Sequence, residues 1–143
     1  MGDQIVAFSG IRQGGTAGQR DLLRIWLSTV GPRLLHNGAA VGADDVCLEL
    51  AVQLGIPFEL WPSTVVSQSV ITRWAPHAAV VHPKAEPLVR NRFMVDRADR
   101  LIACTLSLEP VQRSGTWSTV RYALKMRVPV LMITADGQVR HYE

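Results

Sequence analysis

Short apolar runs alternate with stretches of helical periodicity along the whole chain. Apolar runs bounded by Gly, Pro or polar residues are typical of buried strands, whereas apolar residues at every third or fourth position predict helices. Leu22, Trp26 and Val30 indicate a first helix, which Gly31-Pro32 ends. We predict strands at residues 5–9, 34–36, 58–61, 78–82, 101–104, 130–133 and 138–142, and further helices at about 44–54, 88–98 and 117–126.

This order of elements predicts the fold class. Repeated strand–helix–strand units favour an α/β fold: a single Rossmann-like, doubly wound, mostly parallel sheet with helices on both faces. Asp136-Gly137 indicates a hairpin turn into a short edge strand. The polar residues 62–77 predict a loop or a short irregular helix. We expect residues 1–143 to form one domain, with a fold that binds ligands in a cleft.

The composition is that of an ordinary globular protein. The chain has 143 residues, of which 48% are hydrophobic and 19% charged, a balance that fits one core. No apolar run approaches the roughly 20 residues of a membrane span, and the N-terminus lacks the pattern of a signal peptide. Cys47 and Cys104 lie in apolar stretches, so we expect buried free thiols and a cytoplasmic location. No Cys/His cluster has the spacing of a zinc site.

Basic residues gather in the second half of the chain. Between Arg73 and Arg127 there are ten Lys or Arg and four Asp or Glu. Such an excess suits a phosphate-rich partner, but a solvated surface that keeps the protein soluble has the same composition. Charge alone leaves both interpretations open.

Three predicted strand ends carry residues suited to binding phosphate. Ligands of doubly wound sheets bind at the carboxyl ends of the strands. Glycine lets the backbone approach a ligand, N–H groups at a helix N-terminus attract anions, and arginine pairs with phosphate. The segments are Ser9-Gly10-Ile11-Arg12, the small-residue loop from His36 to Asp44, and Ser114-Gly115-Thr116.

Each segment also has an interpretation without a ligand. A glycine after a strand often serves only a turn, and Asp44 and Ser114 are placed to cap helices. The loop that contains Gly38 and Gly42 is neither a Walker motif nor G-x-G-x-x-G.

A later helix and several aromatic or histidine residues are further candidates. Arg90 and Asn91 can turn inward from the start of their helix, whereas Arg92 fits a plain surface. Trp117 can stack on a base, although a core role explains it better. His36 ends an apolar strand, which favours a hydrogen-bonded structural role. The sequence shows no evident partner for His77, His82 or His141.

Taken together, these segments resemble the superfamily of Smf/DprA and LOG (lonely guy) proteins. The resemblance rests on Ser-Gly-Ile-Arg from Ser9, His-Asn-Gly-Ala-Ala-Val-Gly-Ala-Asp ending at Asp44, Arg-Asn-Arg-Phe-Met from Arg90 and Ser-Gly-Thr from Ser114. Their order and spacing extend it from about residue 5 to 134. It implies a Rossmann-like protein that binds nucleotides. Length and the Gly-Ala-Asp loop are most similar to the short stand-alone branch.

The branches of this superfamily imply different functions. DprA-type proteins bind single-stranded DNA and usually carry extra domains. LOG-type proteins hydrolyse the N-glycosidic bond of a nucleoside monophosphate with an Arg and a Glu. Arg90 lies four residues before Met94, as the LOG arginine does, but Ser118 stands where the LOG glutamate would follow Gly115-Thr116. The missing carboxylate argues against LOG chemistry.

Three functional hypotheses follow. The leading one is a nucleotide or nucleotide-derived phosphate ligand bound in a cleft at the strand ends. The second is hydrolysis of a nucleotide N-glycosidic or phosphate bond, with Arg90 and Asp44 as catalytic candidates and Glu86 or Asp99 as other nearby carboxyl groups. The third is binding of single-stranded DNA through the Arg-rich half.

Several expectations accompany the leading hypothesis. No cofactor is evident, although a polyphosphate ligand can bring Mg²⁺ with it. We expect a homo-oligomer, because the superfamily often self-associates, and we expect Arg90→Ala to weaken anion binding without unfolding the domain. The residues expected to contact the ligand are Ser9, Gly10, Arg12, Gly38, Ala39, Gly42, Asp44, Arg90, Asn91, Ser114, Gly115 and Thr116.

Overall fold

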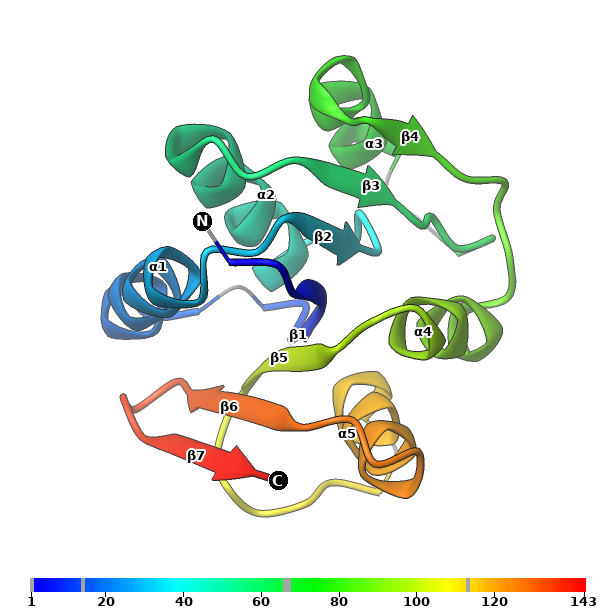
Figure 1. Cartoon of the computed structure of the whole chain (residues 1–143). Helices are drawn as coiled ribbons and strands as arrows, with labels where there is room; N and C mark the ends of the chain where they lie inside the picture. Colours follow the sequence, from blue (N-terminus) through cyan, green and yellow to red (C-terminus); the bar gives the residue numbers. More distant parts are fainter. Residues whose placement is uncertain (1, 14, 66–67, 113) are drawn as a thin grey trace.

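A seven-stranded sheet forms the centre of the computed structural model, which describes residues 2–13, 15–65, 68–112 and 114–143. The strands are β1 (Ile5–Gly10), β2 (Leu34–Asn37), β3 (Phe58–Leu60), β4 (Val80–Val81), β5 (Arg100–Thr105), β6 (Val130–Thr134) and β7 (Val139–Tyr142). Their spatial order is β4-β3-β2-β1-β5-β6-β7 (Figure 1). All neighbours are parallel except β6 and β7, which form the predicted antiparallel hairpin.

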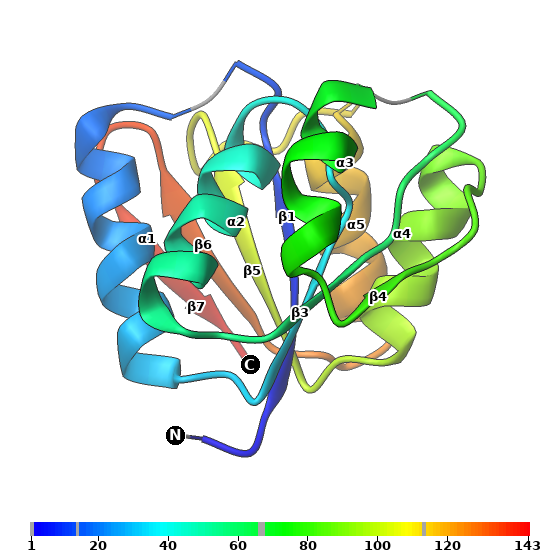
Figure 2. The same cartoon turned by 90° about the horizontal axis from the view of Figure 1, so that it is seen from above.

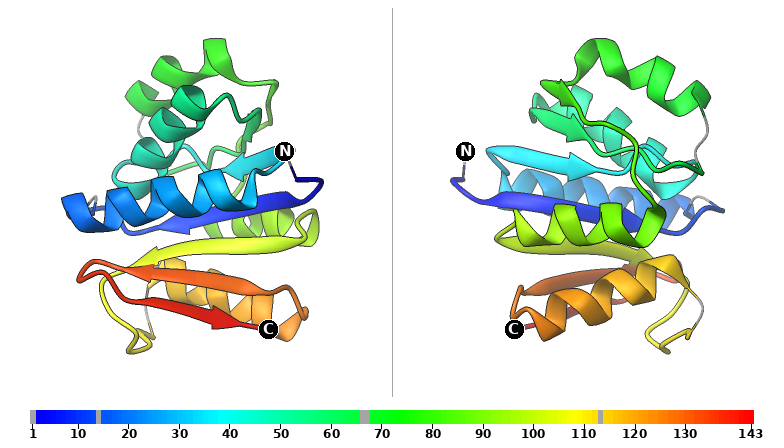
Figure 3. Two further views of the ribbon diagram at one scale, coloured as in Figure 1. Left: turned by 60° about the vertical axis from the view of Figure 1, so that its left-hand side comes forward. Right: turned by 90° about the vertical axis from the view of Figure 1, so that its right-hand side faces the viewer.

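Helices cover both faces of this sheet. The described helices are α1 (Ala17–Val30), α2 (Ala43–Leu54), α3 (Gln68–Trp74), the short 3₁₀ helix η1 (Ala75–His77), α4 (Pro87–Asp96) and α5 (Gly115–Lys125). The first three α-helices lie on one face, and α4 and α5 lie side by side on the other (Figures 2 and 3). The predicted doubly wound α/β fold is thereby confirmed.

Alternating residues of the central strands supply two cores. In β1, Val6 and Phe8 pack with α1 and α2, whereas Ala7 faces α4 and α5, because successive side chains of a strand point to opposite faces. Burial on both faces explains why the central strands read as continuous apolar runs. Cys47 and Cys104 are buried free thiols, as predicted.

The largest departures from the sequence prediction lie between β3 and α4. The segment expected to be a loop or short irregular helix contains the regular helix α3 followed by η1. The strand expected at residues 78–82 is reduced to the two residues of β4. Val80 and Val81 are 42% and 43% exposed, because β4 is an edge strand that pairs only with β3. An apolar run in the sequence does not distinguish such an edge from a buried strand.

The topology places a crevice beside β1. The strand order reverses there, with β2 on one side of β1 and β5 on the other. The chain leaves β1 towards α1 on one face and leaves β5 towards α5 on the opposite face. Loops that diverge in this way open a crevice at the carboxyl ends of the strands.

Candidate functional site

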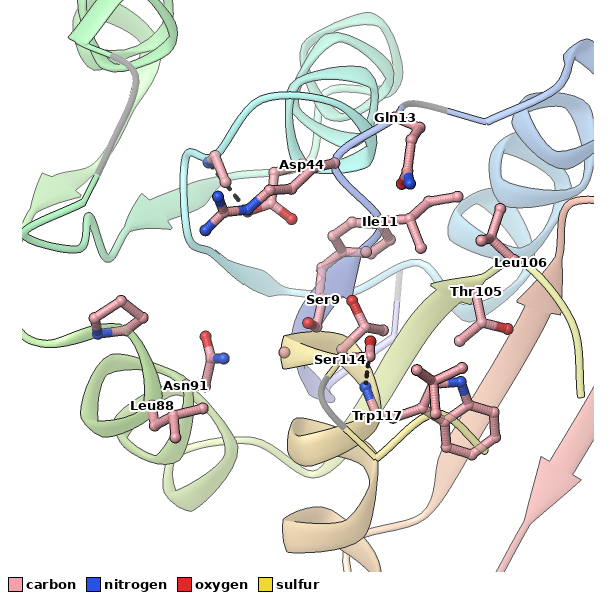
Figure 4. A pocket seen from close by; sticks show the side chains of 18 of the residues that line it. Ser9, Ile11, Gln13, Asp44, Leu88, Asn91, Thr105, Leu106, Ser114 and Trp117 are labelled. Atoms are coloured by element: carbon pink, nitrogen blue, oxygen red, sulfur yellow. Dashed lines mark hydrogen bonds between the residues drawn. The ribbon is translucent and has the colours of Figure 1, made fainter. Parts of the chain in front are cut away.

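A cavity of about 480 Å³ opens at the carboxyl ends of β1 and β5 (Figure 4). Small-molecule sites typically have volumes of about 300–1,000 Å³. Its walls come from β1 and the loop after it, the start of α2, α4, the loop after β5 and the first turn of α5. Nine of the residues predicted to contact a ligand line it: Ser9, Gly10, Arg12, Asp44, Arg90, Asn91, Ser114, Gly115 and Thr116.

The first turn of α5 presents unpaired backbone donors to the cavity. Ser114 caps the helix, and its Oγ accepts a hydrogen bond from the Trp117 N–H at 3.2 Å. The N–H groups of Gly115 and Thr116 have no acceptor among the residues that the structure describes. Free N–H groups and the helix dipole make this end of α5 suited to an anion.

Side chains from β1 and its loop form the neighbouring wall. Ser9, near the end of β1, lines the cavity and lies beside the first turn of α5 in Figure 4. Arg12 is exposed, and its guanidinium makes no hydrogen bond or ion pair with another described residue. A ligand therefore finds both a hydroxyl and an uncommitted positive charge on this wall.

Arg90 is buried between α4 and the ends of two strands. It is 7% exposed, and its Nη1 donates to the carbonyl oxygens of Gly38 at 2.7 Å and Trp61 at 2.9 Å. Its Nε donates to Asn91 Oδ1 at 2.6 Å. Burial lowers the pKa of Arg90, but an arginine stays protonated. Arg90 thus links α4 to the segments after β2 and β3, and it also brings positive charge to the cavity wall.

Gly38, Ala39 and Gly42 lie behind the cavity and do not line it. A Cβ at Gly38 would overlap Nη1 of Arg90, so this glycine leaves room for the guanidinium. Gly42 has φ +87° and packs against the Arg12 carbonyl. Ala39 is fully buried, and its N–H donates to Asn37 Oδ1 at 2.8 Å. In this structure the loop supports Arg90 and the β1–α1 loop.

Asp44 is the carboxyl group of the cavity. It is 5% exposed, and its Oδ2 accepts a hydrogen bond from the Ala40 N–H at 3.1 Å. Burial raises the pKa of Asp44 to about 6, although the charges of Arg90 and Arg12 and the Ala40 hydrogen bond act in the opposite direction. A carboxyl with such a pKa changes its charge close to neutral pH.

The other two predicted carboxyl groups lie elsewhere. Glu86 caps α4, where its side chain accepts a hydrogen bond from the Leu88 N–H. Asp99 precedes β5 and pairs with Ile5 at the opposite end of the sheet. Neither lines the cavity.

The end of β5 and the loop after it contribute wall residues that sequence reasoning missed. Thr105, Leu106 and Ser107 line the cavity. Gln19, buried on α1, fixes the start of this loop, because its Nε2 donates to the carbonyl oxygens of Thr105 at 3.0 Å and Ile133 at 2.8 Å. The one available signal was that Thr105 ends a central strand.

The histidines have structural partners. His36 Nδ1 accepts a hydrogen bond from Trp61 Nε1 at 2.8 Å, which fits the predicted structural role, and burial lowers the pKa of His36. His82, for which the sequence shows no partner, stacks on Trp61 at 3.5 Å between ring centroids and lies 2.7 Å from Glu59. His141 packs edge-on against Trp26. Trp117 is buried among core residues while also lining the cavity.

Comparison with known proteins shows the fold of the chain. No protein-family model and no curated protein matches it. Among solved structures, DNA processing protein A (DprA) from Streptococcus pneumoniae matches with a TM-score of 0.71 and 20% identity, over 92% of this chain and 50% of that one. DprA from Helicobacter pylori, described as binding single-stranded DNA, matches with a TM-score of 0.66 and 21% identity, over 90% of this chain and 64% of that one.

A smaller protein matches over more of its length. The molybdenum cofactor binding protein of Rippkaea orientalis has a TM-score of 0.66 and 21% identity, with 94% of this chain and 78% of that one covered. The present chain spans only about half to two thirds of the DprA chains. These matches show that it has the Rossmann-like fold of the DprA type, as the sequence resemblance implied. Within the described residues no helix is long and apolar enough to cross a membrane.

Proposed function

We propose that the chain binds a nucleotide or a nucleotide-derived phosphate ligand in the cavity at the carboxyl ends of β1 and β5. A phosphate group lies in front of the first turn of α5 and accepts hydrogen bonds from the N–H groups of Gly115 and Thr116. The observation that carries the proposal is that these two donors have no partner among the described residues and face a cavity also lined by Arg12 and Arg90.

The surroundings of Gly115 support this position for the phosphate. A Cβ on Gly115 would have no atom of the described residues within 4 Å, so their packing does not require a glycine there. Side chains on a helix tilt towards its N-terminus, and a side chain at this first position would extend into the space in front of α5. Glycine keeps that space open for a ligand.

Thermal unfolding against a ligand panel tests the proposal. The panel contains the four 5′-mononucleotides, NAD, ADP-ribose and a short single-stranded oligonucleotide. A ligand that binds the folded state raises stability by about 2.7 kcal/mol at 100 times its Kd. We expect at least one small nucleotide to raise the unfolding temperature. No shift with any small nucleotide would contradict the proposal, and a shift with the oligonucleotide alone would favour DNA binding.

A matched pair of variants locates the binding. Gly115→Val blocks the space in front of α5, and we expect it to reduce affinity for the active nucleotide at least tenfold. Gly18→Val makes the same change in the exposed first turn of α1, away from the cavity, where a Cβ meets only Thr16 Oγ1 at 3.8 Å. Valine is a better helix former than glycine by roughly 0.3–0.5 kcal/mol, so both variants should fold. Equal affinities would contradict the proposed position.

Hydrolysis of the bound nucleotide is a second candidate, favoured by the raised pKa of Asp44. Such a group is suited to proton transfer near neutral pH. If Asp44 is a general acid or base, wild type releases base or phosphate from the nucleotide that binds, and Asp44→Asn loses this turnover while still binding. Absence of turnover with a bound nucleotide would leave a binding protein without hydrolase activity.

A further inference from the structure

A second hollow, of about 270 Å³, lies between α4 and α5. On α5 its lining positions recur every three or four residues and therefore share one face of the helix. Leu88 and Asn91 of α4 line this groove and the main cavity alike. The two hollows therefore meet at α4. The groove is lined by Leu88, Asn91, Arg92, Ser118, Thr119, Arg121, Tyr122 and Lys125.

Among the described residues, three cations and no carboxylate line this α4–α5 groove. Within the described part of the chain, Arg92, Arg121 and Lys125 form no ion pair. Arg121 donates to the carbonyl oxygens of Val111 and Gln112 in the loop beside the cavity. Like charges held together attract an anion from solution, so the groove is suited to a phosphate.

Arg92 lies against an aromatic ring of the groove. Its guanidinium carbon is 5.3 Å from the centre of the Tyr122 ring. The Tyr122 hydroxyl donates to Asp96, and this hydrogen bond raises the pKa of Tyr122. Asp96 is thus hydrogen-bonded to a hydroxyl, and among the described residues no carboxylate forms an ion pair with the three cations of the groove.

Asn91 connects the two hollows. It is 9% exposed, and Figure 4 shows its side chain pointing from α4 into the cavity. Its Oδ1 accepts the hydrogen bond from Arg90, whereas its Nδ2 has no acceptor among the described residues. A ligand oxygen that passes Asn91 can accept a hydrogen bond from this free Nδ2.

From these observations we infer that the α4–α5 groove is a second phosphate subsite for the ligand of the main cavity. The ligand class is then a molecule with two phosphate groups separated by a nucleoside, such as a phosphodiester-linked dinucleotide. One phosphate lies at the N-terminus of α5, and the nucleoside between the two phosphates passes Asn91. The other phosphate contacts Arg92, Arg121 and Lys125. This inference rests on the proposed function, because the first phosphate occupies the site described there.

Binding measurements with matched ligands and variants test the subsite. Each 5′-mononucleotide is compared with the 5′-phosphorylated dinucleotide of the same base by titration calorimetry. We expect wild type to bind one dinucleotide at least tenfold more tightly than its mononucleotide, with a steeper salt dependence because a further phosphate releases counterions. In Arg92→Gln/Lys125→Gln the ratio of dinucleotide affinity to mononucleotide affinity should fall to about one third of its wild-type value or less. The affinity for the mononucleotide should stay constant.

The control removes two positive charges elsewhere. Arg24→Gln/Arg140→Gln alters α1 and β7, outside both hollows, and should keep the preference. The subsite is overturned if wild type shows no preference for the dinucleotide, or if Arg92→Gln/Lys125→Gln keeps the wild-type preference. In either case, binding of the mononucleotide would still support the proposed function. An equal loss in both double variants would also overturn the subsite, since net charge would then explain the effect. If neither ligand binds wild type, both proposals fail.

Discussion

Two small-residue loops of this protein look alike in sequence and differ in structure. In the loop from Gly38 to Gly42, atoms of the protein occupy the space that a side chain would need: the Arg90 guanidinium at Gly38 and the Arg12 carbonyl at Gly42. At Gly115, in the first turn of α5, that space is open. Glycine permits a close approach in both segments, and the structure shows that atoms of the protein make this approach at Gly38 and Gly42 but not at Gly115.

The two segments therefore have different roles in the site. The loop after β2 supports the buried Arg90 and the β1–α1 loop, so changes there should affect folding. Gly115, the first residue of α5, makes few demands on packing, so changes at this position should affect binding. Unfolding measurements on variants of the two segments test this difference.

Gly42→Ala should destabilise the fold by about 4 kcal/mol, because it combines the strain of a backbone at φ +87° and ψ −126° with overlap against the backbone of Arg12. Gly55→Ala is the matched control: its φ is +70°, but a Cβ there meets nothing within 4 Å, so only the strain of about 1–2 kcal/mol applies. Urea unfolding measures both. Equal losses in the two variants would show that packing at Gly42 contributes nothing.

Arg90→Met should destabilise the fold by about 3 kcal/mol, because it leaves the buried carbonyl groups of Gly38 and Trp61 without their donor. The sequence-based expectation is that Arg90→Ala weakens anion binding without unfolding the domain, and these contacts add the prediction that loss of Arg90 also lowers stability. Denaturant unfolding of the variant without ligand gives the value. A loss below about 1 kcal/mol would indicate that solvent replaces these bonds easily.

Asp44 should make stability depend on pH between about 4 and 6. Its folded pKa, about 6, lies above its ordinary value of 3.8, so the folded chain holds the proton more tightly than the unfolded chain does. The free energy of unfolding of wild type relative to Asp44→Asn should therefore fall by about 2–3 kcal/mol as the pH rises through this range. Unfolding curves of both proteins at several pH values provide the test. A constant difference would mean that Asp44 titrates normally.

Sequence reasoning reached the fold and nine of the residues that line the cavity for one reason: both follow from local patterns. Apolar runs identified the central strands, and the topology brings strand ends such as Ser9 and loops such as Ser114-Gly115-Thr116 to one edge of the sheet. The reduced strand β4 escaped prediction because edge exposure depends on which strands pair.

What the sequence could not give are contacts between distant segments. The occupation of the space at Gly38 by Arg90 joins residues 52 positions apart. The hydrogen bond from Gln19 Nε2 to the Thr105 carbonyl oxygen joins residues 86 positions apart. The pairing of Trp61 with His36 and His82 likewise depends on the neighbouring strands β2, β3 and β4. No periodicity or motif encodes such contacts.

The most direct test of the central claim is an NMR titration of the ¹⁵N-labelled chain with the mononucleotide that raises its unfolding temperature most. The proposed site predicts that the amide resonances of Gly115 and Thr116 shift most strongly, whereas Gly18, in the equivalent turn of α1, stays unchanged. Large shifts in the loop from Gly38 to Gly42 with Gly115 and Thr116 unmoved would contradict the proposed site, because the ligand would then bind at the other loop.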